Sequence, residues 1–311
     1  ESVISGLMKK HRDKCWIVSK AGHIGWPDMT IKRGEDKKAA KLYTDQLDAS
    51  LKALQVDTID CYMVQGVEHD WIVTMESLYE AFAKARQAGK VRYYGLSTHT
   101  NVPRVCELAS KSGWYDVIML AVNPNSLASL TPAIRTMHEA GIGVVSMKTS
   151  GPIGTNPRAY DKVHGAEFGG ARLSPYQRAY AYLLAKGGID AFIAHMPSRE
   201  ILEEDVAVTT LKLTRAEFDR LEARALADTR GACRHCGDCN RACPEGVNVA
   251  DMLRYHSYIH NYGERETARA LYDALGRDKA SLCTACGACR VACPESIDLA
   301  AVISGLKVEL A

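Results

Sequence analysis

Eight of the eleven cysteines in this 311-residue chain fall in two runs near its end. The runs comprise Cys233, Cys236, Cys239 and Cys243, then Cys283, Cys286, Cys289 and Cys293. Each run reads C-x2-C-x2-C-x3-C-P, so the segment is an internal repeat. Thiolates at this step can bind neighbouring irons on one face of an iron-sulfur cubane. The pattern therefore predicts two 4Fe-4S clusters and the transfer of single electrons.

This spacing is that of bacterial-type ferredoxins with two clusters, and their ligand rule assigns each cysteine. Three cysteines of a run bind one cluster, while the fourth, turned away by the following proline, binds the other. The first cluster is then predicted to be held by Cys233, Cys236, Cys239 and Cys293. The second is predicted to be held by Cys283, Cys286, Cys289 and Cys243.

Two simpler explanations for the cysteines are less consistent with the pattern. Structural zinc would account for paired CxxC motifs, but not for a third cysteine at the same step or for a closing Cys-Pro in both runs. A disulfide framework suits a small secreted domain, whereas the rest of this chain is long and poor in cysteine. Its three other cysteines, Cys15, Cys61 and Cys106, are predicted to be small core residues.

The segment between the two runs predicts a helical module. Apolar residues recur at helical spacing over residues 249–280, and residues 261–263 interrupt them. Asn248 and Asp298 are placed to cap the helices that follow the runs. We therefore expect residues 229–311 to form a helical ferredoxin-like domain of the kind appended to larger redox enzymes. Its acidic and basic residues balance, so it lacks the acidic surface of a free electron shuttle.

Composition sets limits on partners and location. The chain is 47% hydrophobic and 24% charged with a net charge of +2, so nucleic acid is not a favoured partner. The longest apolar stretch, residues 117–122, is too short to cross a bilayer, and no transmembrane segment is expected. Clusters favour a reducing, anaerobic cytoplasmic setting. Export by a twin-arginine signal upstream of this sequence is the alternative.

Residues 1–228 alternate between apolar strands and amphipathic helices. Strands are predicted at 15–19, 58–64, 91–97, 117–122, 144–147 and 191–194, and helices at 37–55, 74–88, 101–112, 126–140 and 174–187. Continuous apolar strands separated by helices indicate a parallel α/β sheet that is buried on both faces.

Particular residues in this region resemble the aldo/keto reductases. Residues 16–20 are similar to the third strand of that family, which ends in its catalytic lysine, and residues 61–67 are similar to the fourth. Residues 89–97 match the fifth-strand pattern G-K-x-R-x-x-G-x-S, and the likeness continues through 141–148 and 198–205. The whole chain resembles aldo/keto reductase-like proteins with a C-terminal iron-sulfur domain.

The resemblance implies a (β/α)8 TIM barrel over residues 1–228 whose first two strands are absent from this sequence. In the family those strands carry the catalytic aspartate and tyrosine, and we expect them to lie upstream. Lys20 stands where the family's catalytic lysine lowers the pKa of that tyrosine. Gln65 stands where most members have histidine, and glutamine can donate a hydrogen bond but cannot carry a proton near neutral pH.

Cofactor contacts also follow from the resemblance. The residues expected to contact NAD(P)H or substrate are Ser97, Asn123, Lys148, Ser198 and Arg199. Lys148 follows the seventh strand, where many members place an aromatic residue against the nicotinamide. In the nucleotide region, His195 and Asp205 replace the expected glycine and asparagine. Further polar residues near strand ends are His23, His69, His99, Asn125 and His164.

Two functions follow from these observations. In the first, the chain is an iron-sulfur oxidoreductase that acts on a small carbonyl or unsaturated substrate and passes electrons to a partner protein. Because hydride transfer moves two electrons and clusters move one, a converter such as a flavin is then needed, although no flavin motif is legible. In the second, the barrel is a scaffold and the clusters conduct electrons within a larger redox complex or homo-oligomer.

Overall fold

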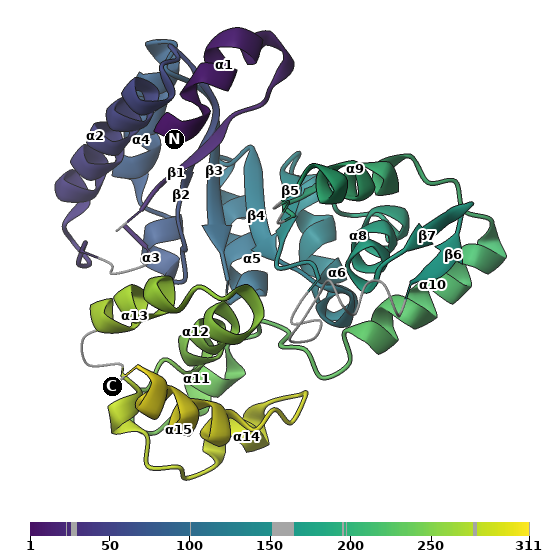
Figure 1. Cartoon of the computed structure of the whole chain (residues 1–311). Coiled ribbons are helices and arrows are strands. Elements are labelled where there is room, and N and C mark those ends of the chain that lie inside the picture. Colours follow the sequence, from purple (N-terminus) through teal and green to yellow (C-terminus); the bar gives the residue numbers. More distant parts are fainter. Residues whose placement is uncertain are drawn as a thin grey trace. The chain divides into compact units, whose positions relative to one another are not determined.

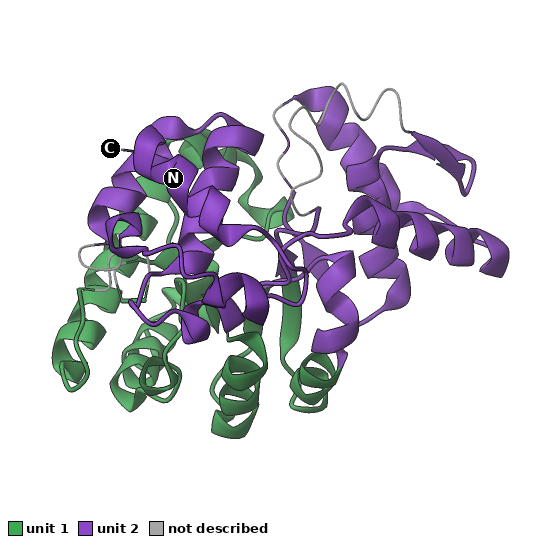
Figure 2. Ribbon diagram, turned by 90° about the horizontal axis from the view of Figure 1, so that it is seen from below, with its two compact units in different colours: residues 1–120, 132–145 green, residues 121–131, 146–311 purple. Residues whose placement is uncertain are grey.

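The computed structural model describes residues 1–22, 24–25, 30–99, 101–150, 165–194, 196, 198–275 and 279–310. They form two compact units (Figure 2). Unit 1 comprises residues 1–120 and 132–145, and unit 2 comprises residues 121–131 and 146–311. The sequence placed a domain boundary after residue 228, and that boundary stays a prediction.

Unit 1 contains most of a parallel sheet and the helices that follow its strands (Figure 1). Its strands are β1 (Val18–Ala21), β2 (Ile59–Val64), β3 (Val91–Thr98), β4 (Val117–Ala121) and β5 (Gly143–Met147), the last two ending in unit 2. Its helices are α1 (Ser5–His11), α2 (Asp36–Leu54), α3 (Asp70–Val73), α4 (Glu76–Gln87), α5 (Val102–Ser112) and α6 (Pro124–Glu139), the last beginning in unit 2.

The strand order is β1-β2-β3-β4-β5-β8, with β8 at Ala191–Phe192. The parallel α/β fold predicted from the sequence is confirmed, and each predicted strand and helix is present. One strand starts late: β1 begins at Val18, although the carbonyl of Ile17 already accepts from the amide of Cys61 over 3.0 Å. The sequence pattern located this strand three residues too early, because its apolar run extends beyond the paired segment.

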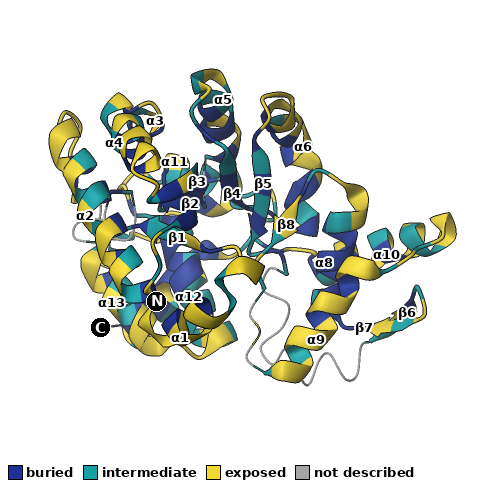
Figure 3. Cartoon of the chain, turned by 90° about the horizontal axis from the view of Figure 1, so that it is seen from above, coloured by how far each residue is buried: buried dark blue, intermediate teal, exposed yellow. Residues whose placement is uncertain are grey.

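Burial explains why these segments fold as they do. Every residue of β2 is buried, as expected for a strand with helices on one face and core on the other. Buried residues of α2 recur every three or four positions, from Ala39 to Leu54, so one face of this helix packs inward. Figure 3 shows the same division on the helices of unit 1, which are buried toward the strands and exposed outward.

Residues 165–228 of unit 2 contain a hairpin and three helices. Of these, only the helix that begins at Pro175 was predicted from the sequence. The hairpin pairs β6 (Ala166–Phe168) with β7 (Ala171–Leu173), and the helices are α8 (Pro175–Lys186), α9 (Arg199–Ala207) and α10 (Arg215–Asp228). Capping boxes begin α8 at Ser174 and α10 at Thr214.

The remainder of unit 2 is the helical module predicted from the sequence. It contains α11 (Asp238–Ala242), α12 (Val249–Tyr262), α13 (Arg265–Ala274), α14 (Ala288–Ala292) and α15 (Leu299–Glu309). Asn248 and Asp298 cap α12 and α15 as predicted, since each side chain accepts an amide hydrogen three residues later. Gly263, with φ of 73°, ends α12 where the sequence placed the interruption. These helices share a core that includes Met252, Tyr255, Ile303 and Leu306.

Candidate redox site

The structure brings the cysteines together across the two runs. The pKa of Cys239 is raised to about 12, chiefly by burial. Three neighbouring thiols, those of Cys233, Cys236 and Cys293, add to the rise. The pKa of Cys233 rises to about 11 through burial and through Cys236 and Cys293. Thiols interact in this way only when they are close, so the closing cysteine of the second run lies with the first run.

A second group forms around the other cysteines. Burial raises the pKa of Cys289, and Cys283 and Cys243 add to the rise. A single hollow is lined by Cys243, Cys283, Cys286 and Cys289, together with residues such as Val247 and Ile303. These are the cysteines that the ferredoxin ligand rule groups together, and the assignment of each one to a cluster stays a prediction.

The backbone around both groups suits bound clusters. The residue two positions after the first cysteine of each run, His235 or Ala285, has φ of 57° and directs its amide at the sulfur of Cys233 or Cys283 over 3.3 and 3.4 Å. Such N–H···S contacts stabilise the charge on cluster sulfurs. Among the described residues, no three metal-ligating side chains converge to hold one ion. A cubane has no need of such convergence, because each iron binds one cysteine.

Two asparagines, Asn123 after β4 and Asn125 in the first turn of α6, bind the first cysteine loop. The Asn123 side chain donates to the backbone carbonyl of Cys233 over 2.9 Å, and that of Asn125 donates to the carbonyl of Ala232 over 3.1 Å. Asn123 is fully buried, and its carbonyl oxygen also accepts from the amide of Ser126 over 3.0 Å. The side chain that the sequence assigned to cofactor contact thus holds a cluster loop in place.

Lys148, at the end of β5, lies against α12. Its ammonium group is 4.7 Å from the ring centroid of Tyr258 and 5.3 Å from that of Tyr262. Burial, helped by the nearby Arg254, lowers the pKa of Lys148 to about 8. Burial also lowers the pKa of His235 to about 3, with contributions from Lys148 and Arg254. A buried, positively charged environment therefore adjoins the first cysteine loop.

In unit 1, three of the predicted site residues share one face of the sheet. The register pairs Lys20 with Met63 and Met63 with Gly95, which puts Gln65 and Ser97 on the face of Lys20. Burial lowers the pKa of Lys20, against a smaller raising effect of the nearby Cys61. The Ser97 hydroxyl accepts from the amide of Gly66 over 3.0 Å, which fixes the chain next to Gln65.

The other predicted residues make different contacts or lie outside the described chain. Ser198 caps α9 by accepting from the amide of Ile201, and Arg199 pairs with Glu203 over 2.8 Å on the surface. Their contact with NAD(P)H stays a prediction. His23, His164 and His195 lie outside the described residues.

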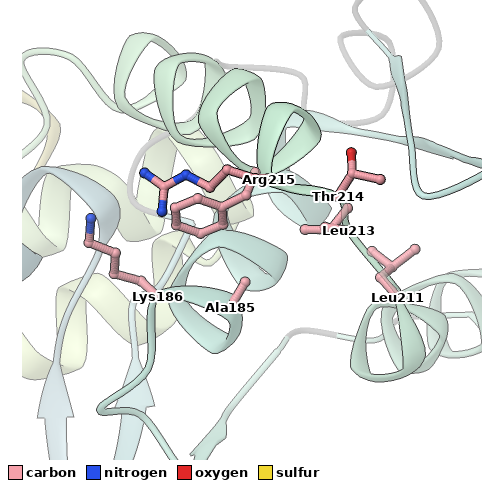
Figure 4. Close-up of a pocket in the computed structure, with 7 residues that line it drawn as sticks. Ala185, Lys186, Leu211, Leu213, Thr214 and Arg215 are labelled. Atoms are coloured by element: carbon pink, nitrogen blue, oxygen red, sulfur yellow. The ribbon is translucent and has the colours of Figure 1, made fainter.

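A surface hollow in unit 2 contains none of the predicted site residues. It lies where α8 ends and α10 begins, and Figure 4 shows Lys186 and Arg215 among its lining residues. Lys186 Nζ is 5.7 Å and Arg215 Cζ 5.8 Å from the ring centroid of Phe218. Both cations have acidic partners, Glu222 at 2.8 Å and Asp219 at 3.0 Å. We therefore interpret this hollow as part of the packing between two helices.

Sequence reasoning missed several groups that complete the site. It gave no role to Tyr258 and Tyr262, which contact Lys148, or to Lys307, whose ammonium group donates to the carbonyl of Cys283 over 2.8 Å. The only signal at Tyr258 was helical spacing, which it shares with core residues, and Tyr262 fell in the interruption at residues 261–263. The capping-box pattern at Thr214 and Glu217 was, by contrast, a legible sign of α10.

The parallel α/β fold and the paired cysteine groups define a redox protein with an iron-sulfur domain. Residues 1–162 match the Aldo/keto reductase family, and residues 229–297 match the 4Fe-4S dicluster domain. The chain therefore belongs to the aldo/keto reductase family, with a dicluster domain at its C-terminal end. The cysteines of that domain imply two 4Fe-4S clusters.

Individual relatives are more distant. Protein tas of Escherichia coli strain K12 is 26% identical over 204 residues, which cover 58% of this chain and 58% of that protein. This chain thus spans somewhat more than half the length of its curated relatives. Aldo-keto reductase AKR11C1 from Bacillus halodurans, in its holo form, aligns over 72% of this chain and 76% of its own with a TM-score of 0.52 and 20% identity. MGS-M4, an aldo-keto reductase from a Medee basin deep-sea metagenome library, aligns over 72% and 77% with a TM-score of 0.51 and 15% identity. These structures establish the fold alone.

No helix among the described residues is both long enough and apolar enough to span a bilayer.

Proposed function

We propose that this protein is an iron-sulfur oxidoreductase that couples redox chemistry on a small carbonyl or unsaturated substrate to electron transfer through two 4Fe-4S clusters. The observation that carries the proposal is the hydrogen bond from Asn123 to the carbonyl of Cys233. Asn123 follows β4, and substrates of this fold bind at the carboxyl ends of the strands. The loop of the first cluster is thereby fastened to a strand end of the kind that binds substrate.

The residues of unit 1 supply the groups that such a reaction needs. Lys20 is a buried amine with a lowered pKa, and Gln65 on the same sheet face adds a neutral hydrogen-bond donor. Together they would orient a substrate oxygen and stabilise negative charge that develops on it. A nicotinamide, when bound, supplies hydride. A flavin or an equivalent group would be needed to divide its two electrons between the clusters.

A second function has a specific observation in its favour. Asn123 is fully buried, with its amide nitrogen on Cys233 and its amide oxygen on Ser126, which is an arrangement that serves the cysteine loop and not a nicotinamide. With Gln65 in the place of the family's histidine, this arrangement favours a barrel that acts as a scaffold. The clusters would then conduct electrons between partner proteins.

An anaerobic titration separates the two functions. NADPH and then NADH are added to the purified protein without substrate, and the visible absorbance of the clusters is followed. Bleaching supports the oxidoreductase and requires a search for a bound flavin. Absence of bleaching, when dithionite still reduces the clusters, favours the scaffold.

Two variants test the same point through individual residues. In the oxidoreductase, Lys20→Met abolishes substrate turnover but keeps the iron content, whereas Lys41→Met, at an exposed lysine of α2, has no effect. In the scaffold, electron transfer between added redox partners is insensitive to Lys20→Met. It is impaired by Cys286→Ser, which removes a ligand of the second cluster.

A further inference from the structure

The two cysteine runs offer an internal comparison, because they repeat the same backbone. His235 and Ala285 both have φ of 57°, and the glycines before α11 and α14, Gly237 and Gly287, have φ of 77° and 81°. Both loops direct an amide at the sulfur of their first cysteine. Any functional difference between the loops therefore resides in their side chains and surroundings.

The first difference is exposure. In the first loop, Cys236 is only partly exposed and the following Gly237 is buried. In the second loop, Thr284, Ala285 and Cys286 are all exposed. Among the described residues, which include all eleven cysteines, Cys286 is the only exposed cysteine. The second loop thus brings an expected cluster ligand to the surface of unit 2.

The second difference is the number of charged side chains. At equivalent positions, the first run has Arg234, His235 and Arg241, with the two arginines paired to Glu295 and Asp238, whereas the second has Thr284, Ala285 and Val291. Val291 is 90% exposed, and Leu282, which directly precedes the first cysteine of the run, is 43% exposed. Arg290, the charged residue within the second run, is 3.6 Å from Asp298, which offsets its charge. The rim of the second loop is therefore exposed, partly apolar and weakly charged, since the remaining cation, Lys307, is held on the carbonyl of Cys283.

We propose that electrons enter and leave this chain through the second loop, and that its rim is the contact surface for a one-electron redox protein with an uncharged, partly apolar face. The proposal deepens the function proposed above and rests on it. Electron transfer slows steeply with distance, so an exposed ligand favours exchange at that loop. Transient electron-transfer contacts are small, and a rim of a few residues around Cys286 suits them. The first cluster, with its loop bound by Asn123, would be the inner one.

The experiment uses two inorganic probes and no substrate. Clusters of the whole protein are reduced with dithionite and then oxidised in a stopped-flow instrument by ferricyanide, an anion, or by hexaammineruthenium(III), a cation. Val291→Glu makes the second rim more negative by one charge. Arg241→Gln makes the equivalent place of the first run more negative by one charge. Val206→Glu, at an exposed valine of α9, is the remote control.

We expect Val291→Glu to change the ratio of the two rates in favour of the cation by about threefold to tenfold at low ionic strength, and much less at high salt. Arg241→Gln and Val206→Glu should leave the ratio within about twofold of wild type. If Arg241→Gln changes the ratio and Val291→Glu does not, electrons are exchanged at the first loop and the proposal is wrong. Equal effects of all three variants would also overturn it. Iron content and cluster absorbance verify each variant. Because no substrate or nicotinamide is present, failure here is distinct from failure of the proposed enzymatic function.

Discussion

The side chain of Asn123 donates a hydrogen bond of 2.9 Å to the backbone carbonyl of Cys233. The equivalent carbonyl of the second run, that of Cys283, accepts instead from Lys307 on α15. One cysteine loop is therefore held by a residue that follows a strand of the sheet, and the other by a residue of the helical module itself.

Loss of either donor should loosen its own loop. Asn123→Leu leaves a partly buried carbonyl without this partner, at a cost of about 1–3 kcal/mol. We expect about half of the iron to be released early when a chelator is added to the anaerobic protein, because one loop opens and the other does not. Lys307→Met should release the other half first. Simultaneous release of all iron in both variants would show that the loops are not independent.

Lys148 should make stability depend on alkaline pH. Its pKa is about 8 in the folded chain against an ordinary 10.5, chiefly through burial. Between these values the unfolded chain binds more protons, so stability rises with pH, by at most about 3 kcal/mol. The thermal midpoint of wild type, relative to that of Lys148→Met, should therefore rise between pH 7 and pH 10. A difference that is constant with pH, or one that falls, would contradict the burial of this amine.

Gly95 should not tolerate a side chain. A Cβ atom there would lie 2.7 Å from the carbonyl oxygen of Val117 and 2.9 Å from Cγ of Met63. Gly95→Ala should lower the free energy of unfolding by about 1–3 kcal/mol, because the strand or the methionine must shift. Gly6→Ala is the matched control, since no atom lies within 4 Å of the added carbon within α1. There we expect no loss, and a gain of up to about 1 kcal/mol. Thermal unfolding of the two variants makes the comparison.

Asp60 should be important to the stability of unit 1. This buried carboxylate accepts from Arg12 at 2.9 Å, from Arg92 at 2.8 Å and from the amide of Ile17 at 2.8 Å. Asp60→Ala leaves the buried amide without a partner and should cost about 2–4 kcal/mol. Asp48→Ala breaks an exposed pair with Lys90 and should cost less than about 1 kcal/mol. If both variants lose similar stability in a thermal unfolding assay, burial does not make the interactions of Asp60 stronger than those of an exposed pair.

The sequence by itself determined the elements and the expected cluster chemistry of this protein where the signal is local. The spacing of Cys233, Cys236 and Cys239 depends on one short stretch of chain, and so do the caps at Asn248 and Asp298. The periodicity of buried residues in α2 and the continuous apolar run of β2 are local in the same sense. Such patterns can be read from the chain because each reflects the geometry of a single turn, helix or strand.

Only the tertiary structure decided which distant residues meet. Asn123 and Cys233 are 110 residues apart in the sequence, and nothing local to either indicates the other. Lys148 and Tyr258 come together for the same reason, through packing of the segment after β5 against α12. The difference in exposure between Cys236 and Cys286 also arises there, because the two runs share one spacing but have different surroundings. Spacing selects the kind of site, whereas burial and long-range contacts set its charge, its access and its partners.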